Sequence, residues 1–420
     1  MADRPSLLFL CQTLPYPPDG GAHIRSYHLY RMLAEKFDVT GLFFYRRATR
    51  SSEGAVVESV QGLGRLGRAE AFPIVQETSR PRFVWDHLRS TVLRRAYTVF
   101  SYESRAFRTR LRELLRSQDF DLVHMDSLDL SGFATELAGL PVVCGHHNVE
   151  SALLARRAGA ESSALRRRYL GLQARLTAEE EARFCPGFAA NITCSPIDSA
   201  LLREIAPGST VTEVPNGVDV EFFQPSGSDD SPVDDGAGRI VFVGGYSWFP
   251  NRDGMEWFAA EVLPLIRQGR PGVEVTWVGR IPPEVERRYR ETFGIHATGF
   301  VEDVRPYLAG ADCVVVPIRV GGGTRLKILD AWAMGRPMVS TSIGCEGLEA
   351  VDGENILVRD EAEAFASGVE AVLADRALRS AVGSAGRRTA MERYAWSVIG
   401  ERVRTLYGQV AAGQPPGLAL

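Results

Sequence analysis

Short runs of apolar residues alternate with longer stretches of helical periodicity along most of the chain. Before residue 217 we predict six strands, at SLLFLC (6–11), VTGLFFY (39–45), DLVHMDS (121–127), PVVCGHH (141–147), AANITCS (189–195) and TVTEVPN (210–216). Apolar runs this short, separated by helices such as 24–37, are typical of parallel strands that are buried on both faces. Right-handed crossovers between such strands produce a doubly wound α/β sheet.

Residues 224–238 interrupt this alternation. The segment QPSGSDDSPVDDGAG is rich in Gly, Pro, Ser and Asp, which is typical of a flexible linker. The alternation resumes at IVFVGG (240–245), EVTWVG (274–279), IHATG (295–299), DCVVVP (312–317) and PMVSTS (337–342). We therefore predict an N-terminal Rossmann-like domain (1–223), the linker (224–238), a C-terminal Rossmann-like domain (239–394) and a final helical segment (395–420) that crosses back to the first domain.

Composition is consistent with two such domains. The 420 residues are 45% hydrophobic, which is enough to build two cores. A net charge of -4, from 48 basic and 52 acidic residues, gives no reason to expect nucleic acid as a partner. The six cysteines form no C-x-x-C pair, so we expect reduced core residues in a cytoplasmic protein. We see no secretory signal and no apolar run long enough to span a membrane.

Ligands of doubly wound sheets bind beyond the carboxyl ends of the strands, so the loops there are candidate sites. In PYPPDGGAHIR (15–25), Gly20 and Gly21 would allow a ligand to approach the backbone, although a plain turn is an equal alternative. In VVCGHHNVE (142–150), His146 and His147 follow a strand and could orient a hydroxyl or accept a proton. The alternative is a hydrogen-bonded core or loop histidine.

The run VPIRVGGGTRLKILDAWAMGRP (316–337) has the strongest signal. Three glycines follow a strand and lead into an amphipathic helix, predicted to begin near Thr324 and to end at Gly335. A glycine loop that opens a helix can bind an anion, and Arg325 and Lys327 add positive charge there. Asp330, about two turns into the run, could accept both hydroxyls of a ribose. A purely structural glycine turn is the alternative.

A fourth loop begins at Gly299, where backbone groups of Phe300 and Val301 could meet a flat base; an ordinary loop is the alternative. The chain has no D-x-D pair between apolar runs, so no metal site is predicted and no cofactor is expected. The glycine loop at 321–323 is neither a Walker loop nor a G-x-G-x-x-G loop. No predicted strand is followed by G-x-G-x-x-G with an acidic residue downstream, and no G-x-S-x-G elbow is present. Helix ends and cations would then have to balance any phosphate charge.

These motifs together resemble glycosyltransferase family 4. The similar segments are PYPPDGGAHIRSYHL near the start, VPNGVDVEFFQP (214–225) and, most specifically, GADCVVVPIRVGGGTRLKILDAWAMGRPMVSTSIGCEGL (310–348). The last of them, with HNVES (147–151), is similar to a branch found in bacterial exopolysaccharide clusters. The resemblance implies the GT-B fold, two Rossmann-like domains facing each other across a cleft, and a retaining, metal-independent hexosyltransferase. It also implies an acceptor-side N-terminal domain and a C-terminal domain that binds the nucleotide sugar.

The resemblance implies a role for each matched residue. Gly20 and Gly21 would lie near the donor diphosphate, and His147, less surely His146, at the reacting sugar and acceptor. Backbone groups of Gly322, Gly323 and Thr324 would hold sugar and phosphate oxygens. The charges of Arg325 and Lys327 would neutralise the diphosphate. Asp330 would take the ribose and Val301 would lie at the base.

Two departures from the family pattern stand out. The family usually has two glutamates separated by seven residues, but here Gly322 replaces the first and Asp330 the second. Recognition of the sugar by the first glutamate is therefore lost or replaced. In VGGYSWFPNRDG (243–254), Gly245 stands where the family tends to have an arginine. Arg252 is a candidate replacement.

The resulting hypothesis is transfer of a sugar from a nucleoside diphosphate sugar to a saccharide or polyprenyl-linked acceptor, in bacterial polysaccharide or glycoconjugate biosynthesis. Two alternatives stay open: a nucleotide-sugar-binding protein without transferase activity, and a GT-B nucleotide-sugar 2-epimerase. The segment with Arg105, Arg108, Arg112 and Arg116 could form a basic amphipathic helix on an anionic membrane, assisted by 164–176. The protein would then be cytoplasmic and peripheral at the inner face of the cell membrane. A solvated helix face is the alternative.

Overall fold

The computed structural model describes residues 4–47, 52–225 and 238–415. The chain divides into two compact units. Unit 1 comprises Met1–Pro215 and Gly400–Leu420, and unit 2 comprises Asn216–Ile399. The predicted domain boundary at 223/224 lies eight residues after this division, and most of the predicted linker, 226–237, lies outside the described residues.

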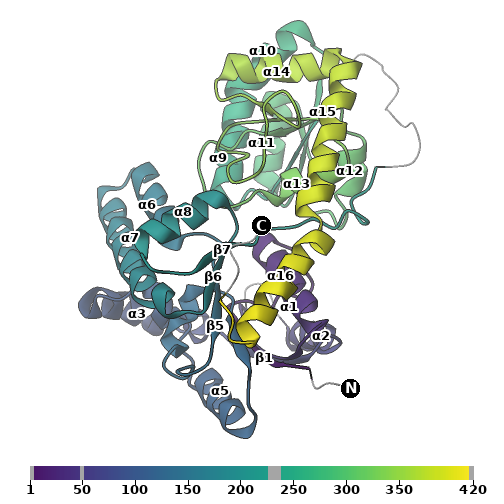
Figure 1. Cartoon of the computed structure of the whole chain (residues 1–420). Coiled ribbons are helices and arrows are strands. Elements are labelled where there is room, and N and C mark those ends of the chain that lie inside the picture. Colours follow the sequence, from purple (N-terminus) through teal and green to yellow (C-terminus); the bar gives the residue numbers. More distant parts are fainter. Residues whose placement is uncertain (1–3, 48–51, 226–237, 416–420) are drawn as a thin grey trace. The chain divides into compact units, whose positions relative to one another are not determined.

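Unit 1 is built on a seven-stranded parallel sheet in the order β3-β2-β1-β4-β5-β6-β7 (Figure 1). Its strands are β1 (Ser6–Cys11), β2 (Asp38–Tyr45), β3 (Arg68–Pro73), β4 (Leu122–Met125), β5 (Val142–Gly145), β6 (Ala190–Thr193) and β7 (Val211–Glu213). The direction of the strand order reverses between β1 and β4. This topological switch point is where a doubly wound sheet binds ligands.

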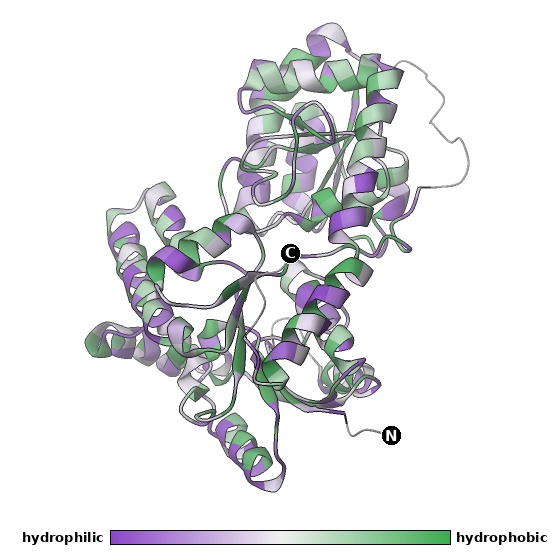
Figure 2. Ribbon diagram, viewed as in Figure 1, coloured by the Kyte–Doolittle hydropathy of each residue, from purple (hydrophilic) through white to green (hydrophobic). Residues whose placement is uncertain are grey.

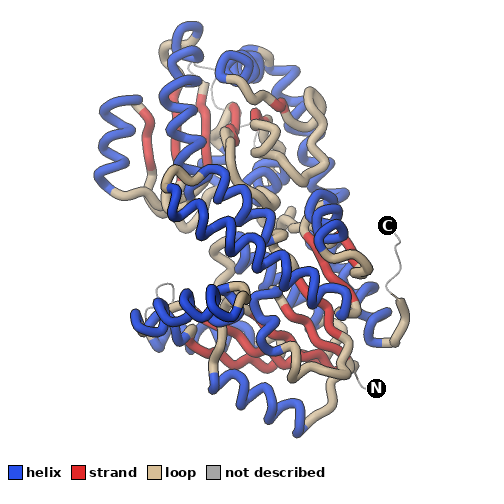
Figure 3. Tube along the Cα trace, turned by 90° about the vertical axis from the view of Figure 1, so that its left-hand side faces the viewer, coloured by secondary structure: helices blue, strands red, loops and turns tan. Residues whose placement is uncertain are grey.

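The helices of unit 1 connect these strands and cover the sheet, seen as blue tubes beside the red strands in Figure 3. They are α1 (Gly21–Ala34), α2 (Glu53–Gly64), η1 (Val75–Thr78), α3 (Arg80–Leu93), α4 (Tyr97–Ser101), α5 (Arg105–Ser117), η2 (Leu128–Phe133), α6 (Glu150–Ala160), α7 (Ala164–Phe184), η3 (Cys185–Gly187) and α8 (Pro196–Ile205). The buried residues of β1, β2 and β4 form the centre of the core with aromatic side chains such as Phe44 and Phe107, whose rings stack.

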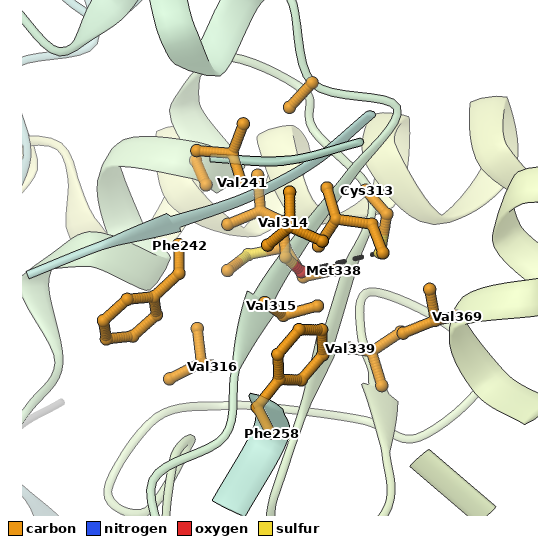
Figure 4. Packing of buried hydrophobic residues seen from close by; sticks show 14 of the residues in the cluster. Val241, Phe242, Phe258, Cys313, Val314, Val315, Val316, Met338, Val339 and Val369 are labelled. Carbon is orange, nitrogen blue, oxygen red and sulfur yellow. Dashed lines mark hydrogen bonds between the residues drawn. The ribbon is translucent and has the colours of Figure 1, made fainter. Parts of the chain in front are cut away.

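Unit 2 repeats the same topology with a six-stranded parallel sheet in the order β10-β9-β8-β11-β12-β13. Its strands are β8 (Arg239–Val243), β9 (Glu274–Val278), β10 (Ile295–Ala297), β11 (Cys313–Val316), β12 (Met338–Ser340) and β13 (Leu357–Val358). The switch point lies between β8 and β11. Figure 4 shows why these strands read as apolar runs: Val241, Phe242 and Val314 to Val316 are buried among side chains of neighbouring elements.

The helices of unit 2 follow the strands in the same alternation. They are α9 (Phe249–Trp257), η4 (Phe258–Val262), α10 (Leu263–Gly269), α11 (Pro283–Phe293), α12 (Arg305–Ala309), α13 (Leu326–Ala333), α14 (Ala362–Ala374), α15 (Arg376–Thr389) and η5 (Ala390–Tyr394). The last helix, α16 (Trp396–Ala411), begins in unit 2, and from Gly400 onward its residues belong to unit 1. The prediction of two Rossmann-like domains is therefore confirmed.

All eleven predicted strands are present, but the sequence pattern missed two edge strands. Strand β3 has the sequence RAEAFP, and most of its residues are only half-buried, so it has no continuous apolar run. Strand β13 is two residues long. The predicted helix start at Thr324 was also wrong: Arg325 occupies the N-cap position of α13 and makes no side-chain cap. The six cysteines are free and buried, as expected of core residues.

The helix predicted to lie on a membrane is α5, and its apolar side is not available. Phe107 and Leu111 are fully buried in the core of unit 1. Two of the arginines, Arg108 and Arg112, form ion pairs with Glu136. The structure therefore favours the alternative for α5, a solvated polar face on a core-packed helix.

Candidate functional site

Glycines shape the switch point of unit 2. After β11, Gly321 and Gly323 have φ values of 133° and 76°, a backbone region that residues with a Cβ atom rarely adopt. Helix α9 comes so close to this loop that a Cβ atom on Gly254 would lie 2.3 Å from the carbonyl oxygen of Pro317. The sequence GGG therefore produces a tight corner directly before the N-terminus of α13, where free backbone N–H groups can meet an anion.

Arg325 is buried at this corner. Its guanidinium Nη1 donates hydrogen bonds to the carbonyl oxygen of Gly323 at 2.6 Å and to that of Gly322. These bonds orient the two peptide groups, and they keep a positive charge immediately beside the loop. The structure thus gives Arg325 a loop-shaping contact in addition to the charge for which the sequence singled it out.

Lys327 lies at the centre of the corner. Its Nζ donates to Oδ1 of Asn251 at 2.8 Å and lies 4.2 Å from the ring centroid of Phe242. Asn251 in turn donates through Nδ2 to the carbonyl oxygen of Gly245 at 3.0 Å, which connects the β8 loop to the β11 loop. Burial, followed by repulsion from Arg325, lowers the pKa of Lys327 to about 7. An anionic ligand would stabilise the protonated, positively charged form of this lysine.

Asp330 follows on the same helix. Burial raises its pKa to about 7, while the charge of Lys327 opposes that rise. Hydrogen bonds from the vicinal hydroxyls of a ligand would stabilise the ionised form of this carboxyl group. Asp330 is therefore suited to accept such bonds. The geometry thus groups Gly322, Gly323, Arg325, Lys327 and Asp330 around the N-terminus of α13, as the sequence predicts.

The loop after β10 supplies a second feature of unit 2. Val301 packs against the core, whereas the neighbouring Phe300 is exposed with the guanidinium of Arg280 5.0 Å from its ring centroid. Arg252 stands over the rings of Tyr246 and Phe249, at 5.5 Å from each centroid. Sequence reasoning noted Phe300 and Arg252 but not Arg280, because a single arginine in a loop has no distinguishing signal.

Unit 1 places a histidine at its own switch point. Asp126, directly after β4, is fully buried and accepts hydrogen bonds through Oδ2 from Ser26 Oγ at 2.7 Å, His147 Nε2 at 3.1 Å and Cys11 Sγ at 3.2 Å. Burial opposes its ionisation, but the charge of His147 and bonds from the histidines outweigh this and keep the pKa of Asp126 well below its usual value. His147 is therefore held by a charged partner.

A second histidine extends this network. His124 Nε2 lies 3.3 Å from Asp126 Oδ1, and its Nδ1 lies 2.6 Å from the hydroxyl of Tyr407 on α16. Burial lowers the pKa of His124, although Asp126 opposes the shift. If His124 is neutral and donates a hydrogen bond to Asp126 through Nε2, its Nδ1 accepts a hydrogen bond from the hydroxyl of Tyr407. The sequence did not reveal Asp126, His124 or Tyr407 as partners, because they come from segments far apart in the chain.

The two adjacent histidines have different environments. His146 is buried, its Nε2 lies 3.1 Å from Oδ1 of Asn191, and burial lowers its pKa to about 4. It thus matches the core-histidine alternative. His147 is less buried and lines a pocket together with residues of α4, η2 and α7. Both residues follow β5 and line this pocket, but they have different hydrogen-bond partners.

The pocket beside His147 is rich in carboxyl groups. Asp129, Glu150, Glu180 and Glu181 contribute to its wall. Burial, and for Glu150 also the charge of Asp129, raises the pKa of Glu150 and Glu181 to about 7. Near neutral pH such groups can both donate and accept hydrogen bonds, as required for binding hydroxyl groups.

Gly20 and Gly21 lie in unit 1, at the start of α1. Gly20 is the N-cap residue, and a Cβ atom on it would meet nothing within 4 Å. The loop is therefore open at this point, which is compatible with close approach of a ligand to the backbone. Within residues 4–47, 52–225 and 238–415, no group of three or more His, Cys, Asp or Glu side chains is placed to hold a metal ion.

Comparisons with known proteins identify the class. A model described as Glycosyltransferase Family 4 matches residues 19–222, and one described as Glycosyl transferases group 1 matches residues 237–375. The two matches together cover most of the chain, with residues 223–236 between them. The protein thus belongs to the family 4 type of glycosyltransferases, which have the GT-B fold.

Individual relatives agree with this class. The phosphatidyl-myo-inositol mannosyltransferase of Mycolicibacterium smegmatis is 30% identical over 217 residues, which are 49% of this chain and 54% of that protein. The match thus spans about half the length of this curated relative. Sucrose-phosphate synthase from Thermosynechococcus elongatus has a TM-score of 0.71 at 18% identity, covering 97% of this chain and 100% of that one. Anabaena HepE in complex with UDP-glucose has a TM-score of 0.63 at 15% identity, covering 96% and 99%.

Proposed function

We propose that the protein transfers a sugar from a nucleoside diphosphate sugar to a saccharide or lipid-linked acceptor. The observation that carries this proposal is the corner of unit 2 in which Arg325 and Lys327 flank a glycine loop at a helix N-terminus. The positive charge of this corner and the free backbone N–H groups at the start of α13 suit the anionic oxygens of a diphosphate. HepE, which has the same fold, is described in complex with UDP-glucose, and this supports a nucleotide-sugar donor.

In the proposed donor complex, backbone groups of Gly322, Gly323 and Thr324 bind sugar and phosphate oxygens. The charges of Arg325 and Lys327 neutralise the diphosphate, and Asp330 binds the ribose. The base lies against the β10 loop at Val301, where Phe300 and Arg280 offer a ring and a cation for stacking.

The reaction replaces one bond to the anomeric carbon by another. The bond to the β-phosphate oxygen breaks and its electron pair leaves with the nucleoside diphosphate. The acceptor oxygen forms the new bond on the same face, so the configuration is retained. The acceptor proton then passes to the departing phosphate oxygen, which lies on that face. The positive corner stabilises the charge that develops on the leaving group, and no metal is required.

The acceptor side of the proposal rests on unit 1. In the proposal, His147 binds an acceptor hydroxyl beside the carboxyl-lined pocket; its hydrogen bond to Asp126 supports this role. Carboxyl groups whose pKa lies near 7 suit a polyhydroxylated acceptor, because they can supply either hydrogen-bonding role. The name of the mycobacterial relative, a mannosyltransferase for phosphatidyl-myo-inositol, supports a lipid-linked acceptor and a role in glycoconjugate biosynthesis.

Calorimetry and product analysis test the proposal. UDP, GDP and their sugar conjugates would be titrated into the protein, and the donor that binds would then be incubated with phosphatidylinositol or a polyprenyl-linked saccharide in EDTA. We expect nucleoside diphosphate release that depends on the acceptor, and a product with the donor's anomeric configuration by NMR. Binding without such release would indicate a binding protein. An epimerised free sugar would indicate an epimerase.

A further inference from the structure

Helix α3 turns its apolar side outward. Val84, Trp85, Leu88 and Val92 are 64%, 55%, 53% and 70% exposed. They recur at spacings of three and four residues, so they form one stripe along the helix. In Figure 2, hydrophobic colour marks the outer end of the helix labelled α3 in Figure 1. A helix at the surface of a globular unit normally places such a stripe against the core.

Polar contacts keep α3 in this orientation. Its inner side carries Asp86 and Ser90, both fully buried. Asp86 accepts hydrogen bonds from Arg82 Nε at 2.8 Å and Gln76 Nε2 at 3.2 Å. Ser90 Oγ accepts a bond from Gln173 Nε2 on α7 at 2.9 Å. Rotating the stripe inward would remove a buried carboxylate from its partners, which is costly. The outward apolar face is thus a stable feature of unit 1.

Positive charge surrounds the stripe. Of the five arginines in residues 80–95, Arg80 and Arg94 are exposed, and the other three form ion pairs with carboxylates. The start of α7 lies beside α3, because the hydroxyl of Tyr169 bonds to Nδ1 of His87. Just before Tyr169, residues 166–168 are three consecutive exposed arginines. Leu165, which precedes them, is 80% exposed. Apolar residues within a rim of cations suit the interface of an anionic bilayer.

The end of α3 is connected to the pocket of unit 1. Arg95, two residues beyond the helix, forms an ion pair with Glu180, with Nη2 and Oε2 2.8 Å apart. Glu180 lines the carboxyl-rich pocket beside His147, and so does Ala96, the residue that follows Arg95. A surface that holds α3 would therefore also lie next to the pocket.

We propose that the outer face of α3 docks in the plane of an anionic phospholipid bilayer. As an α-helix of 14 residues, α3 is about 21 Å long, and none of the helices in the described part of the chain is long and apolar enough to cross a membrane. The helix inserts Val84, Trp85, Leu88 and Val92 among the acyl chains near the headgroups. The exposed arginines Arg80 and Arg94, with those at 166–168, contact lipid phosphates. Docking also places the pocket next to a lipid-linked acceptor; this last step rests on the proposed function.

Vesicle flotation tests the docking surface directly. The full chain would be mixed with vesicles of phosphatidylcholine alone or with 30% phosphatidylglycerol, in low and high salt. We expect flotation with the anionic vesicles that decreases with salt, and little with phosphatidylcholine. The triple variant Val84→Glu/Leu88→Glu/Val92→Glu should lose about tenfold or more in lipid affinity. Val57→Glu, at a 53% exposed position on α2, is the matched control and should float like the wild type.

Three results would overturn the docking proposal. One is failure of the wild-type chain to float, and another is unchanged flotation of the triple variant. The third is a lipid-independent dimer, detected by sedimentation, that the triple variant dissociates, because a second copy would then cover α3. An unchanged circular dichroism spectrum and an unchanged thermal unfolding midpoint establish that the variant is folded.

Activity on two acceptors separates this proposal from the proposed function. If both hold, the triple variant uses a water-soluble acceptor headgroup at the wild-type rate and loses rate on the same headgroup in vesicles. Flotation without any transferase activity would refute the proposed function and leave the docking proposal standing. Transferase activity on both acceptors without flotation would refute the docking proposal and leave the proposed function standing.

Discussion

The switch points of the two units have the same topology and opposite chemistry. In unit 2, the loops after β8 and β11 bring together a glycine corner, Arg325 and Lys327. In unit 1, a buried aspartate directly after β4 contacts His124 of β4 and His147 of the loop after β5, beside a pocket with four acidic side chains. The fold therefore determines where a ligand can bind, and the loop residues determine its charge. A diphosphate suits the first site and hydroxyl groups suit the second.

Removal of the cation from unit 2 should have the largest effect. We expect Lys327→Ala to lower turnover by about 10²–10³-fold, because it removes charge stabilisation of the leaving group. UDP affinity should fall as well. Steady-state kinetics and calorimetry measure the two effects. The sequence contains one other lysine, Lys36, which is exposed, so Lys36→Ala is the matched control. Wild-type turnover in Lys327→Ala would refute the assignment of the donor site.

Loss of the charged partner in unit 1 should have the next largest effect. We expect Asp126→Asn to reduce turnover about ten- to hundredfold, because His147 loses the carboxylate that orients it. UDP affinity should not change, since the donor corner is in unit 2. Asp126 is then a positioning residue, and His147→Ala should give a similar decrease. His296→Ala, at an exposed histidine of β10, serves as the control. An equal loss of UDP affinity would contradict the separation of the two sites.

The acidic pocket of unit 1 should reduce stability at alkaline pH. The pKa of Glu181 is raised to about 7 in the folded state, so the folded state binds more protons than the unfolded one above the ordinary glutamate pKa. Stability should therefore fall as the pH rises through this window to about 7. At pH 8, Glu181→Gln should recover on the order of 2 kcal/mol in urea unfolding. Glu204→Gln, at an exposed position, should leave the pH profile unchanged.

The smallest predicted signal is proton uptake by unit 2. Without ligand, the pKa of Lys327 is about 7, and a bound diphosphate should raise it. At pH 8, UDP binding should therefore take up close to one proton, seen as a dependence of the calorimetric enthalpy on the ionisation enthalpy of the buffer. Lys327→Arg should bind UDP with no uptake, because arginine is already protonated. Undiminished uptake in Lys327→Arg would assign the proton to another group, such as Asp330.

By itself, the sequence determined the class of the fold and the residues of the glycine corner that we propose as the donor site. Short apolar runs predict buried parallel strands because their side chains are buried on both faces, and GGGTRLK is a local segment whose glycines, cations and helix start are contiguous. The edge strands β3 and β13 escaped prediction because they are half-buried or only two residues long.

Only the tertiary structure decided the remaining features. Asp126, His124 and Tyr407 are one network because β4 and α16, 283 residues apart at the His124–Tyr407 bond, pack together. The distinct environments of His146 and His147 likewise arise from neighbours outside their own segment. For the same reason, the apolar side of α5 is buried in the core, whereas that of α3 is exposed. The periodicity of the sequence shows which residues share the apolar side of a helix. Whether this apolar side faces the core or the solvent depends on the tertiary contacts that the opposite, polar side makes.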